Sequence, residues 1–256
     1  MTFKQKISLI AHTCALFGVM ATFKLLLWYV LRPKIEEDSF DKLNPLLQYV
    51  LRPNIEDNFD KRNSTDTKNN ISRQELEMSD SEAQRHAIQY TTLPERFLRY
   101  LISHIGINYQ EYDFVDIGCG KGRVLLVASS FPFRSIAGIE LSRPALEIAE
   151  KNIRTYRSAD QKCFNIHIRK VDARCFEPDI ANTVYYFFEP FDTVILTAVL
   201  ANLSSKLRGQ GKMIYVVCIW RDLSSVVKLF EMHGFQTIRT QIMLFSIRNY
   251  AIFSLQ

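Results

Sequence analysis

The second half of the chain alternates short apolar runs with amphipathic segments of helical spacing. The apolar runs have the length of strands and cover residues 114–117, 135–140, 165–171, 183–188 and 212–219. The segments with apolar residues at helical spacing cover residues 94–105, 144–156, 192–207 and 221–233. Strands that alternate with helices indicate a parallel sheet with helices on both faces.

The last two segments, 235–241 and 244–254, are typical of an antiparallel hairpin. We therefore predict an α/β fold with a doubly wound, seven-stranded, mainly parallel sheet. The chain has 256 residues, of which 47% are hydrophobic. This length is more than a usual single domain needs and less than two full domains need.

The first predicted strand ends in a glycine-rich turn. Residues 114–122 read Phe-Val-Asp-Ile-Gly-Cys-Gly-Lys-Gly, and a helical pattern begins at Arg123. Its three glycines can adopt positive φ and let the backbone approach a ligand, and they are Gly118, Gly120 and Gly122. A strand, a glycine loop and a helix N-terminus in this order predict a site for a nucleoside-like cofactor.

Dinucleotides and S-adenosylmethionine both fit such a loop. Asp116 precedes the first glycine by two residues, where a carboxylate would repel a pyrophosphate but can orient an ammonium group. The G-x-G-x-G spacing also differs from the G-x-G-x-x-G of dinucleotide sites. Glu140 ends the next strand about 20 residues on, where an acid suits ribose hydroxyls in either cofactor. The loop favours S-adenosylmethionine over NAD.

Residues 88–256 resemble the class I S-adenosylmethionine-dependent methyltransferases, which have a Rossmann-like fold. Four strings at successive strand ends carry the resemblance, and they are 115–123, 138–142, 171–173 and 187–191. The resemblance implies that the cofactor is S-adenosylmethionine, bound by Asp116, Gly118, Cys119, Gly120, Gly122, Arg123, Glu140, Leu141, Asp172 and Ala173. In this comparison Asp172 accepts a hydrogen bond from the adenine amino group, and Tyr90 closes over the cofactor. Asp172 as the cap of a turn is the alternative.

The fourth string, Phe187-Phe-Glu-Pro-Phe191, is expected to face the transferred methyl group. Similar enzymes that methylate nitrogen place Asn, Asp or Ser before the proline and an aromatic residue after it. Glu189 departs from that pattern and suits the cationic nitrogen of a lysine or a free amine, beside an aromatic face. We therefore predict Glu189, Pro190 and Phe191 as catalytic residues; a simple helix cap is the alternative role of Glu189.

These residues predict a methyltransferase that acts on a nitrogen of a protein side chain or a small molecule. A non-catalytic module with this fold is one alternative, and a nucleic acid methyltransferase is another. The net charge of +5 is not gathered into a basic tract, so the sequence has no clear nucleic-acid signature. The five cysteines are scattered without a C-x-x-C pair, and no metal site is predicted.

The N-terminal part differs in composition from the rest. Residues 7–31 are apolar apart from Lys24, which predicts a membrane-anchor helix in a segment 1–31; a monotopic or core-packing helix and a cleaved signal are the alternatives. Residues 32–85 are expected to be a flexible linker, with a repeat at 29–42 and 49–61. The methyltransferase domain, 86–256, would then face the cytoplasm, where its cofactor is made.

Overall fold

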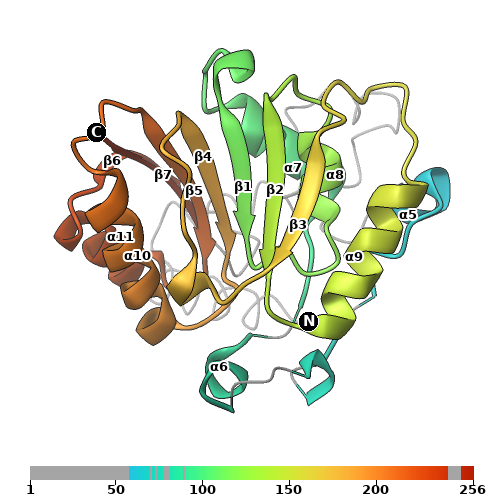
Figure 1. The fold of residues 1–256 in the computed structure, drawn as a ribbon, viewed down its shortest axis with the longest axis horizontal. Coiled ribbons are helices and arrows are strands. Elements are labelled where there is room, and N and C mark those ends of the chain that lie inside the picture. The colour runs from blue at the N-terminus through green and yellow to red at the C-terminus, as the bar shows by residue number, and fades with distance from the viewer. Residues whose placement is uncertain (1–57, 70, 73, 78–80, 89, 242–248) are drawn as a thin grey trace, which may run out of the picture. The chain divides into compact units, whose positions relative to one another are not determined.

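The structure is a computed structural model, and it describes residues 58–69, 71–72, 74–77, 81–88, 90–241 and 249–256. Seven strands form one sheet (Figure 1). They are β1 (Asp113–Ile117), β2 (Ser135–Glu140), β3 (Ile166–Lys170), β4 (Thr183–Phe188), β5 (Ile214–Trp220), β6 (Gln236–Gln241) and β7 (Asn249–Leu255).

The strand order across the sheet is β3-β2-β1-β4-β5-β7-β6. Strands β1 to β5 pair in parallel, and β7 runs antiparallel to β5 and β6. Ile117 in β1 pairs with Ile139 in β2 and with Phe187 in β4. The loops that follow these three strands therefore leave the sheet at the same edge, which places the three predicted motifs together.

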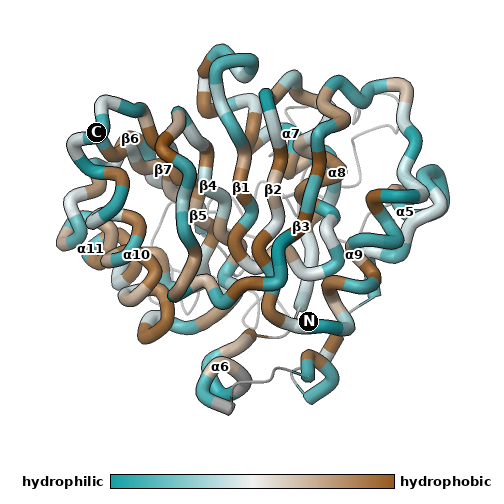
Figure 2. Tube along the Cα trace, in the orientation of Figure 1, coloured by the Kyte–Doolittle hydropathy of each residue, from teal (hydrophilic) through white to brown (hydrophobic). Residues whose placement is uncertain are grey.

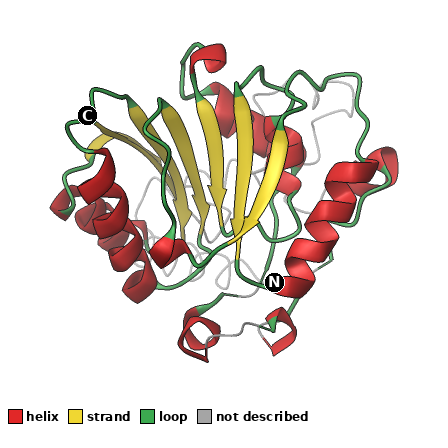
Figure 3. Cartoon of the chain, in the orientation of Figure 1, coloured by secondary structure: helices red, strands yellow, loops and turns green. Residues whose placement is uncertain are grey.

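The helices flank the sheet on two sides (Figure 3). Those at the N-terminal end are α5 (Phe59–Asn63), α6 (Ser81–His86) and α7 (Glu95–Ser103), and those that follow are α8 (Arg123–Ala128), α9 (Arg143–Thr155), α10 (Thr193–Leu207) and α11 (Leu223–Met232). Short 3-10 turns are η2 (Gln74–Leu76), η3 (Tyr109–Glu111) and η4 (Ala173–Cys175). Helices α10 and α11 cover one face, and α7 and α8 lie against the other.

The sequence accounts for these elements in ordinary physical terms. The central strands are mainly apolar, with polar residues near their ends (Figure 2), because both faces of the sheet are covered. Phe114 and Phe187 are fully buried, and burial of each such side chain contributes about 1.5–3 kcal/mol. Ser142 caps α9 by accepting a hydrogen bond from the Ala145 N–H, as its position before a proline in the first turn predicts.

The fold prediction is confirmed for the α/β class and the mainly parallel seven-stranded sheet. The observed strands and helices begin and end close to the predicted residues, and β6 and β7 form the antiparallel pair expected at the end. β7 begins at Asn249, whereas its predicted strand begins at residue 244, which lies outside the described residues.

The prediction of a membrane-anchored localisation needs correction. No helix within the described ranges is both long and apolar enough to cross a bilayer. Residues 7–31, on which the prediction depends, lie outside those ranges, as does most of the repeat. The structure therefore gives no support for the N-terminal hydrophobic helix, the membrane partner or the orientation inferred from it.

The described part of the expected linker is folded against the domain. Phe59 is fully buried, although polar residues surround it in the sequence. We call residues 59–68 the strap, because this segment lies across the first turn of α8 and part of α9. The sequence interpretation missed it because one aromatic residue in a polar stretch gives no periodic signal. The division of the chain at residues 31 and 85 stays a prediction.

Candidate functional site

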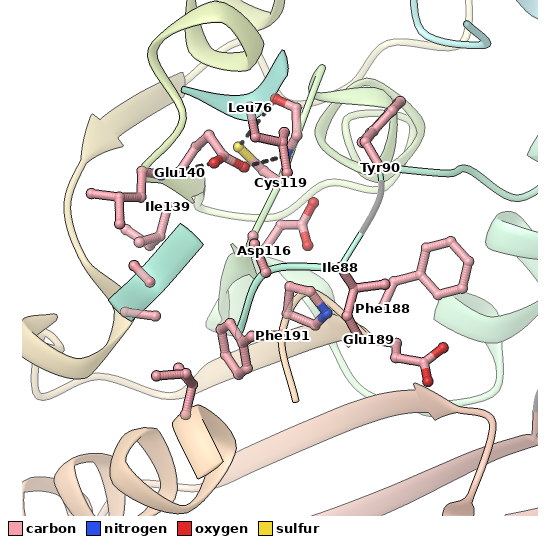
Figure 4. A pocket seen from close by; sticks show the side chains of 18 of the residues that line it. Leu76, Ile88, Tyr90, Asp116, Cys119, Ile139, Glu140, Phe188, Glu189 and Phe191 are labelled. Carbon is pink, nitrogen blue, oxygen red and sulfur yellow. Dashed lines mark hydrogen bonds between the residues drawn. The ribbon is translucent and has the colours of Figure 1, made fainter. Parts of the chain in front are cut away.

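A pocket of about 1020 Å³, including the solvent at its mouth, opens at the carboxyl ends of β1, β2 and β4 (Figure 4). Its size is that of a small-molecule site. Of the predicted site residues all but Gly122 line it, namely Asp116, Gly118, Cys119, Gly120, Arg123, Glu140, Leu141, Asp172, Ala173, Glu189, Pro190 and Phe191. The structure thus brings together the two groups of residues that the sequence assigns to cofactor and acceptor.

The glycine loop between β1 and α8 has the predicted backbone. Gly118, Gly120 and Gly122 have φ values of 78°, 52° and 82°. A Cβ at Gly118 would lie 2.2 Å from Pro190 Cβ, and one at Gly120 would lie 2.2 Å from Tyr90 Cδ2. Any larger residue would therefore meet a pocket-lining side chain as well as backbone strain. Gly122 contributes differently, as the residue before α8.

Glu140 at the end of β2 organises the loops around it. Its Oε2 accepts a hydrogen bond from the Gly120 N–H at 2.9 Å, and its Oε1 accepts from Leu141 and Ser142 at 2.8 Å and 2.7 Å. Burial raises the pKa of this carboxyl, although the three backbone bonds act in the opposite direction. Backbone N–H groups thus occupy three of the four acceptor positions of the carboxylate. The fourth, on Oε2, remains for a group in the pocket.

Asp116 is the last residue but one of β1 and is 2% exposed. Burial raises its pKa well above the usual value, and the nearby Glu140 raises it further. Two deeply buried carboxyls close to each other favour a cationic ligand group beside them. A positive charge offsets both the cost of burying the carboxylates and the repulsion between them. In Figure 4 the Asp116 side chain lies between the glycine loop and the loop that contains Glu189.

Asp172 has a more local arrangement than the resemblance implies. It caps η4 by accepting from the Arg174 N–H at 2.8 Å, and its carboxylate also accepts from Arg174 Nε and Nη2. Arg174 Nη1 in turn donates to Glu82 of α6 at 2.7 Å. Asp172 lines the pocket. It also forms the turn cap that is the alternative to the adenine contact, so its adenine role stays a prediction.

Glu189 follows β4 in a left-handed backbone conformation, with φ of 40°. Such strain in a non-glycine residue is common at functional sites. Its side chain is 5% exposed, and Oε1 accepts a hydrogen bond from Arg221 Nε at 2.8 Å. Asp192, and not Glu189, caps α10 by accepting from the Val194 and Ile195 N–H groups. The alternative of a helix cap is therefore excluded for Glu189.

The residues present fit S-adenosylmethionine. Asp116 supplies an anion for an ammonium group, and Glu140 can accept from a hydroxyl through Oε2. The glycine loop is sandwiched between Tyr90 and Pro190 and offers backbone where a Cβ would collide. Apolar side chains of Leu141 and Val171 line the same pocket and suit an aromatic base.

Comparisons with known proteins find similarity to methyltransferases. Residues 110–191 match the model of a family described as "Putative methyltransferase". A malonyl-[acyl-carrier protein] O-methyltransferase from Halalkalibacterium halodurans is 31% identical over 106 residues, which are 40% of this chain and 37% of that protein. An enzyme of the same name from Priestia megaterium is 25% identical over 129 residues, 49% of this chain and 44% of its own.

This chain thus spans less than half the length of the curated relatives it matches. The crystal structure of glycopeptide N-methyltransferase MtfA with S-adenosylmethionine has the same fold, with a TM-score of 0.50 at 12% identity, covering 62% of this chain and 92% of that one. Residues 110–191 thus match a methyltransferase family, and the fold around them is the Rossmann-like fold of class I S-adenosylmethionine-dependent methyltransferase domains. S-adenosylmethionine is the cofactor of such domains.

Several residues in and around the pocket were missed by the sequence interpretation. Leu76, Ala83 and Ala87 line it from the segment before the first predicted helix. Arg221, at the end of β5, bonds to Glu189 although no motif marks it. The only sequence signal for Arg221 is its place, since it follows the fifth strand at the edge where ligands bind in such sheets.

Proposed function

We propose that this chain is an S-adenosylmethionine-dependent methyltransferase whose acceptor is a nitrogen of a small molecule or of a protein side chain. One observation supports it above the others. The cofactor residues Asp116 and Glu140 and the acceptor loop at Glu189 line a single pocket. A non-catalytic module would have no need of the second group of residues in that place.

The cofactor, when bound, supplies a methyl group already activated on sulfur. The protein therefore has to bind, orient and exclude water, and orientation alone can contribute several kcal/mol to the rate. Glu140 fixes the glycine loop, and Asp116 orients the ammonium end of the cofactor. Phe188 and Phe191 line the acceptor side and keep water from it.

Glu189 is the residue we assign to the acceptor. Its carboxylate is almost fully buried at the pocket wall, where an amine can donate a hydrogen bond to it. A negative charge there also stabilises the positive charge that grows on nitrogen during transfer. The pairing with Arg221 fixes the carboxylate on one oxygen.

A carboxylate oxygen is the second candidate for the acceptor. The two relatives named above are O-methyltransferases of malonyl-acyl-carrier protein by their names. Arg221 gives this candidate its own support in the structure. Its side chain is 52% exposed beside Glu189, and a guanidinium is the residue type that best holds a carboxylate.

Labelled methyl transfer tests both candidates. Full-length protein is incubated with S-adenosylmethionine labelled on the methyl group and a lysate, and the product is identified by mass spectrometry. Mild alkali then separates the chemistries, because methyl esters release volatile methanol and methylated amines keep the label. Alkali-stable label supports the nitrogen acceptor, volatile label supports the oxygen acceptor, and no incorporation above a Glu140→Ala control contradicts the enzyme function.

A further inference from the structure

The strap is joined to the glycine loop and to the helix that follows it through three separate groups of residues. The first is Phe59, whose ring stacks on Tyr156 with 6.0 Å between centroids. The guanidinium carbon of Arg123 lies 4.6 Å from the centroid of the same ring. Arg123 is the first residue of α8 and lines the pocket, so the strap supports the helix that begins at the glycine loop.

Asp60 gives the strap a defined shape. Its Oδ1 accepts from the hydroxyls of Thr65 and Thr67, at 2.8 Å and 2.6 Å. Its Oδ2 accepts from the backbone N–H groups of Thr67 and Lys68, at 2.8 Å and 2.7 Å. One carboxylate thus closes a turn of nine residues, 60–68, and Thr67 near its end is fully buried.

Asp66 is the second point of contact with the loop. Lys121, which lies between Gly120 and Gly122, donates to both oxygens of Asp66 at 3.1 Å. The Lys121 side chain is only 4% exposed, and its ion pair with Asp66 offsets the cost of burying the ammonium group. Asn152 of α9 ties the pair further, because its amide donates to the Lys121 and Asp66 carbonyls and accepts from the Asp66 N–H.

Tyr90 is the third point of contact. Its hydroxyl donates to the Thr67 carbonyl at 2.7 Å, and its ring packs against Gly120 from the pocket side. Figure 4 shows Tyr90 on the same side of the pocket as the loop that contains Cys119. The position of this ring over the loop therefore depends on the turn that Asp60 closes.

We propose that the strap is a positioning element of the cofactor site, which holds the glycine loop in its binding conformation. Asp66 acts through Lys121, and Asp60 acts through Thr67 and Tyr90. This inference rests on the assignment of S-adenosylmethionine as the cofactor. The strap itself contacts neither reacting group, so its loss should weaken cofactor binding and leave turnover at saturating cofactor nearly unchanged.

Binding of S-adenosylhomocysteine to the full-length protein, measured by calorimetry, tests the inference. Asp66→Asn removes the charge that holds Lys121 and should weaken binding on the order of tenfold. Asp60→Asn keeps one acceptor oxygen but sets an amide against two backbone N–H groups, and should weaken binding to a similar extent. Asp160→Asn is the matched control, because it removes a surface ion pair with Arg99. The control variant should bind S-adenosylhomocysteine with the affinity of the wild type.

Two further measurements separate positioning from a loss of overall stability. Amide exchange at Gly120 and Lys121 in the ligand-free protein should be faster in Asp66→Asn and unchanged in the control. In a double-mutant cycle, Asp66→Asn should weaken binding no further once Lys121→Met is present. The proposal is wrong if Asp66→Asn and Asp60→Asn both bind S-adenosylhomocysteine with wild-type affinity and exchange the Gly120 and Lys121 amides at the wild-type rate.

The failure of the cofactor assignment has a different signature. If the wild type binds no S-adenosylhomocysteine, the proposed function is wrong, and the exchange rates at Gly120 and Lys121 then decide on the strap alone. If the wild type binds and the strap variants bind as tightly, only the strap proposal is wrong. Kinetics add a check, since a positioning role raises the KM for the cofactor while kcat stays within about twofold.

Discussion

The two halves of the pocket are stabilised in different ways. In the cofactor half, the glycine loop is held by Glu140, by Lys121 with Asp66, and by Tyr90 with the strap. In the acceptor half, Glu189 has one described ion pair, with Arg221, and Phe188, Phe191 and Ile195 contribute apolar walls. Bonds to three polar side chains and the strap fix the glycine loop of the first half. The loop of the second half is paired with the backbone of residues 86–88, through Ile88 N–H to the Pro190 carbonyl and Asp192 N–H to the His86 carbonyl, and Glu189 is its charged wall.

This difference indicates how each half should respond to mutation. A cofactor shared by a whole fold class requires one loop shape, which backbone bonds specify well. Acceptors differ between enzymes, so acceptor recognition depends on side chains that can change without loss of the fold. Changes in the cofactor half should therefore alter the dissociation constant of the cofactor, and changes in the acceptor half should alter kcat.

Glu140→Ala should have the largest effect. It removes the acceptor of three backbone N–H groups and the contact predicted for the ribose hydroxyls. Hydrogen bonds to a charged group contribute about 1.5–3 kcal/mol each, so we expect the dissociation constant of S-adenosylhomocysteine to rise on the order of a hundredfold or more. Calorimetry on the folded variant provides the measurement.

Glu140→Gln is the matched control for this change. It keeps the length of the side chain and one oxygen, and should bind with an affinity between those of the alanine variant and the wild type. If Glu140→Ala bound S-adenosylhomocysteine as tightly as the wild type, the cofactor half would not depend on Glu140, and the proposed difference between the two halves would be wrong.

The sequence predicted the cofactor half because its residues lie in contiguous strings. Asp116 and Glu140 lie at the ends of β1 and β2, and the glycines follow β1 directly. Parallel strands bring their carboxyl ends to one edge of the sheet, so these residues can be placed together from the sequence alone. The strap and α6 could not be found this way. Their contacts join Asp66 to Lys121 and Glu82 to Arg174, across 55 and 92 positions of the chain. No local periodicity records pairs so distant.

Glu189→Gln tests the acceptor half. The substitution keeps size and hydrogen-bonding reach but removes the negative charge beside the acceptor. We expect kcat for an amine acceptor to fall at least tenfold, while the dissociation constant of the cofactor changes less than about twofold. Stopped-assay turnover and calorimetry on the same preparation supply both quantities. If turnover and cofactor affinity fell by the same factor, Glu189 would belong to the cofactor half of the pocket and not to the acceptor half.

Arg221→Gln should have a smaller effect, and the kinetic constant that changes should distinguish the two candidate acceptors. Arg221 is half exposed, and ion pairs of this kind contribute about 1 kcal/mol or less. With a nitrogen acceptor, we expect kcat to fall about threefold to fivefold because Glu189 is less well held. With a carboxylate acceptor, the KM for that acceptor should rise and kcat should stay the same. Steady-state kinetics with each acceptor class distinguish the two.

The conformation of Glu189 lay beyond sequence reasoning for a different reason. The motif Glu189-Pro190-Phe191 was recognised, but its left-handed backbone and its pairing with Arg221 depend on how β4 and β5 lie beside each other. Pro190, which follows this left-handed residue, fills the space over Gly118. A motif can thus mark a site while its geometry is set by tertiary packing.

The smallest expected effect is a pH dependence of the strap. Burial raises the pKa of Asp60, but the hydrogen bonds from Thr67, Thr65 and the backbone outweigh it and hold the pKa below the ordinary value of 3.8. A carboxyl whose pKa is depressed on folding stabilises the folded state above its unfolded pKa, and this contribution is lost as the pH falls through the folded pKa. The urea midpoint of the wild type should therefore exceed that of Asp60→Asn by a constant margin above about pH 5, and the margin should narrow below pH 3.8. A margin that stays constant down to the acid limit of the fold would mean that the Asp60 carboxylate does not hold the strap.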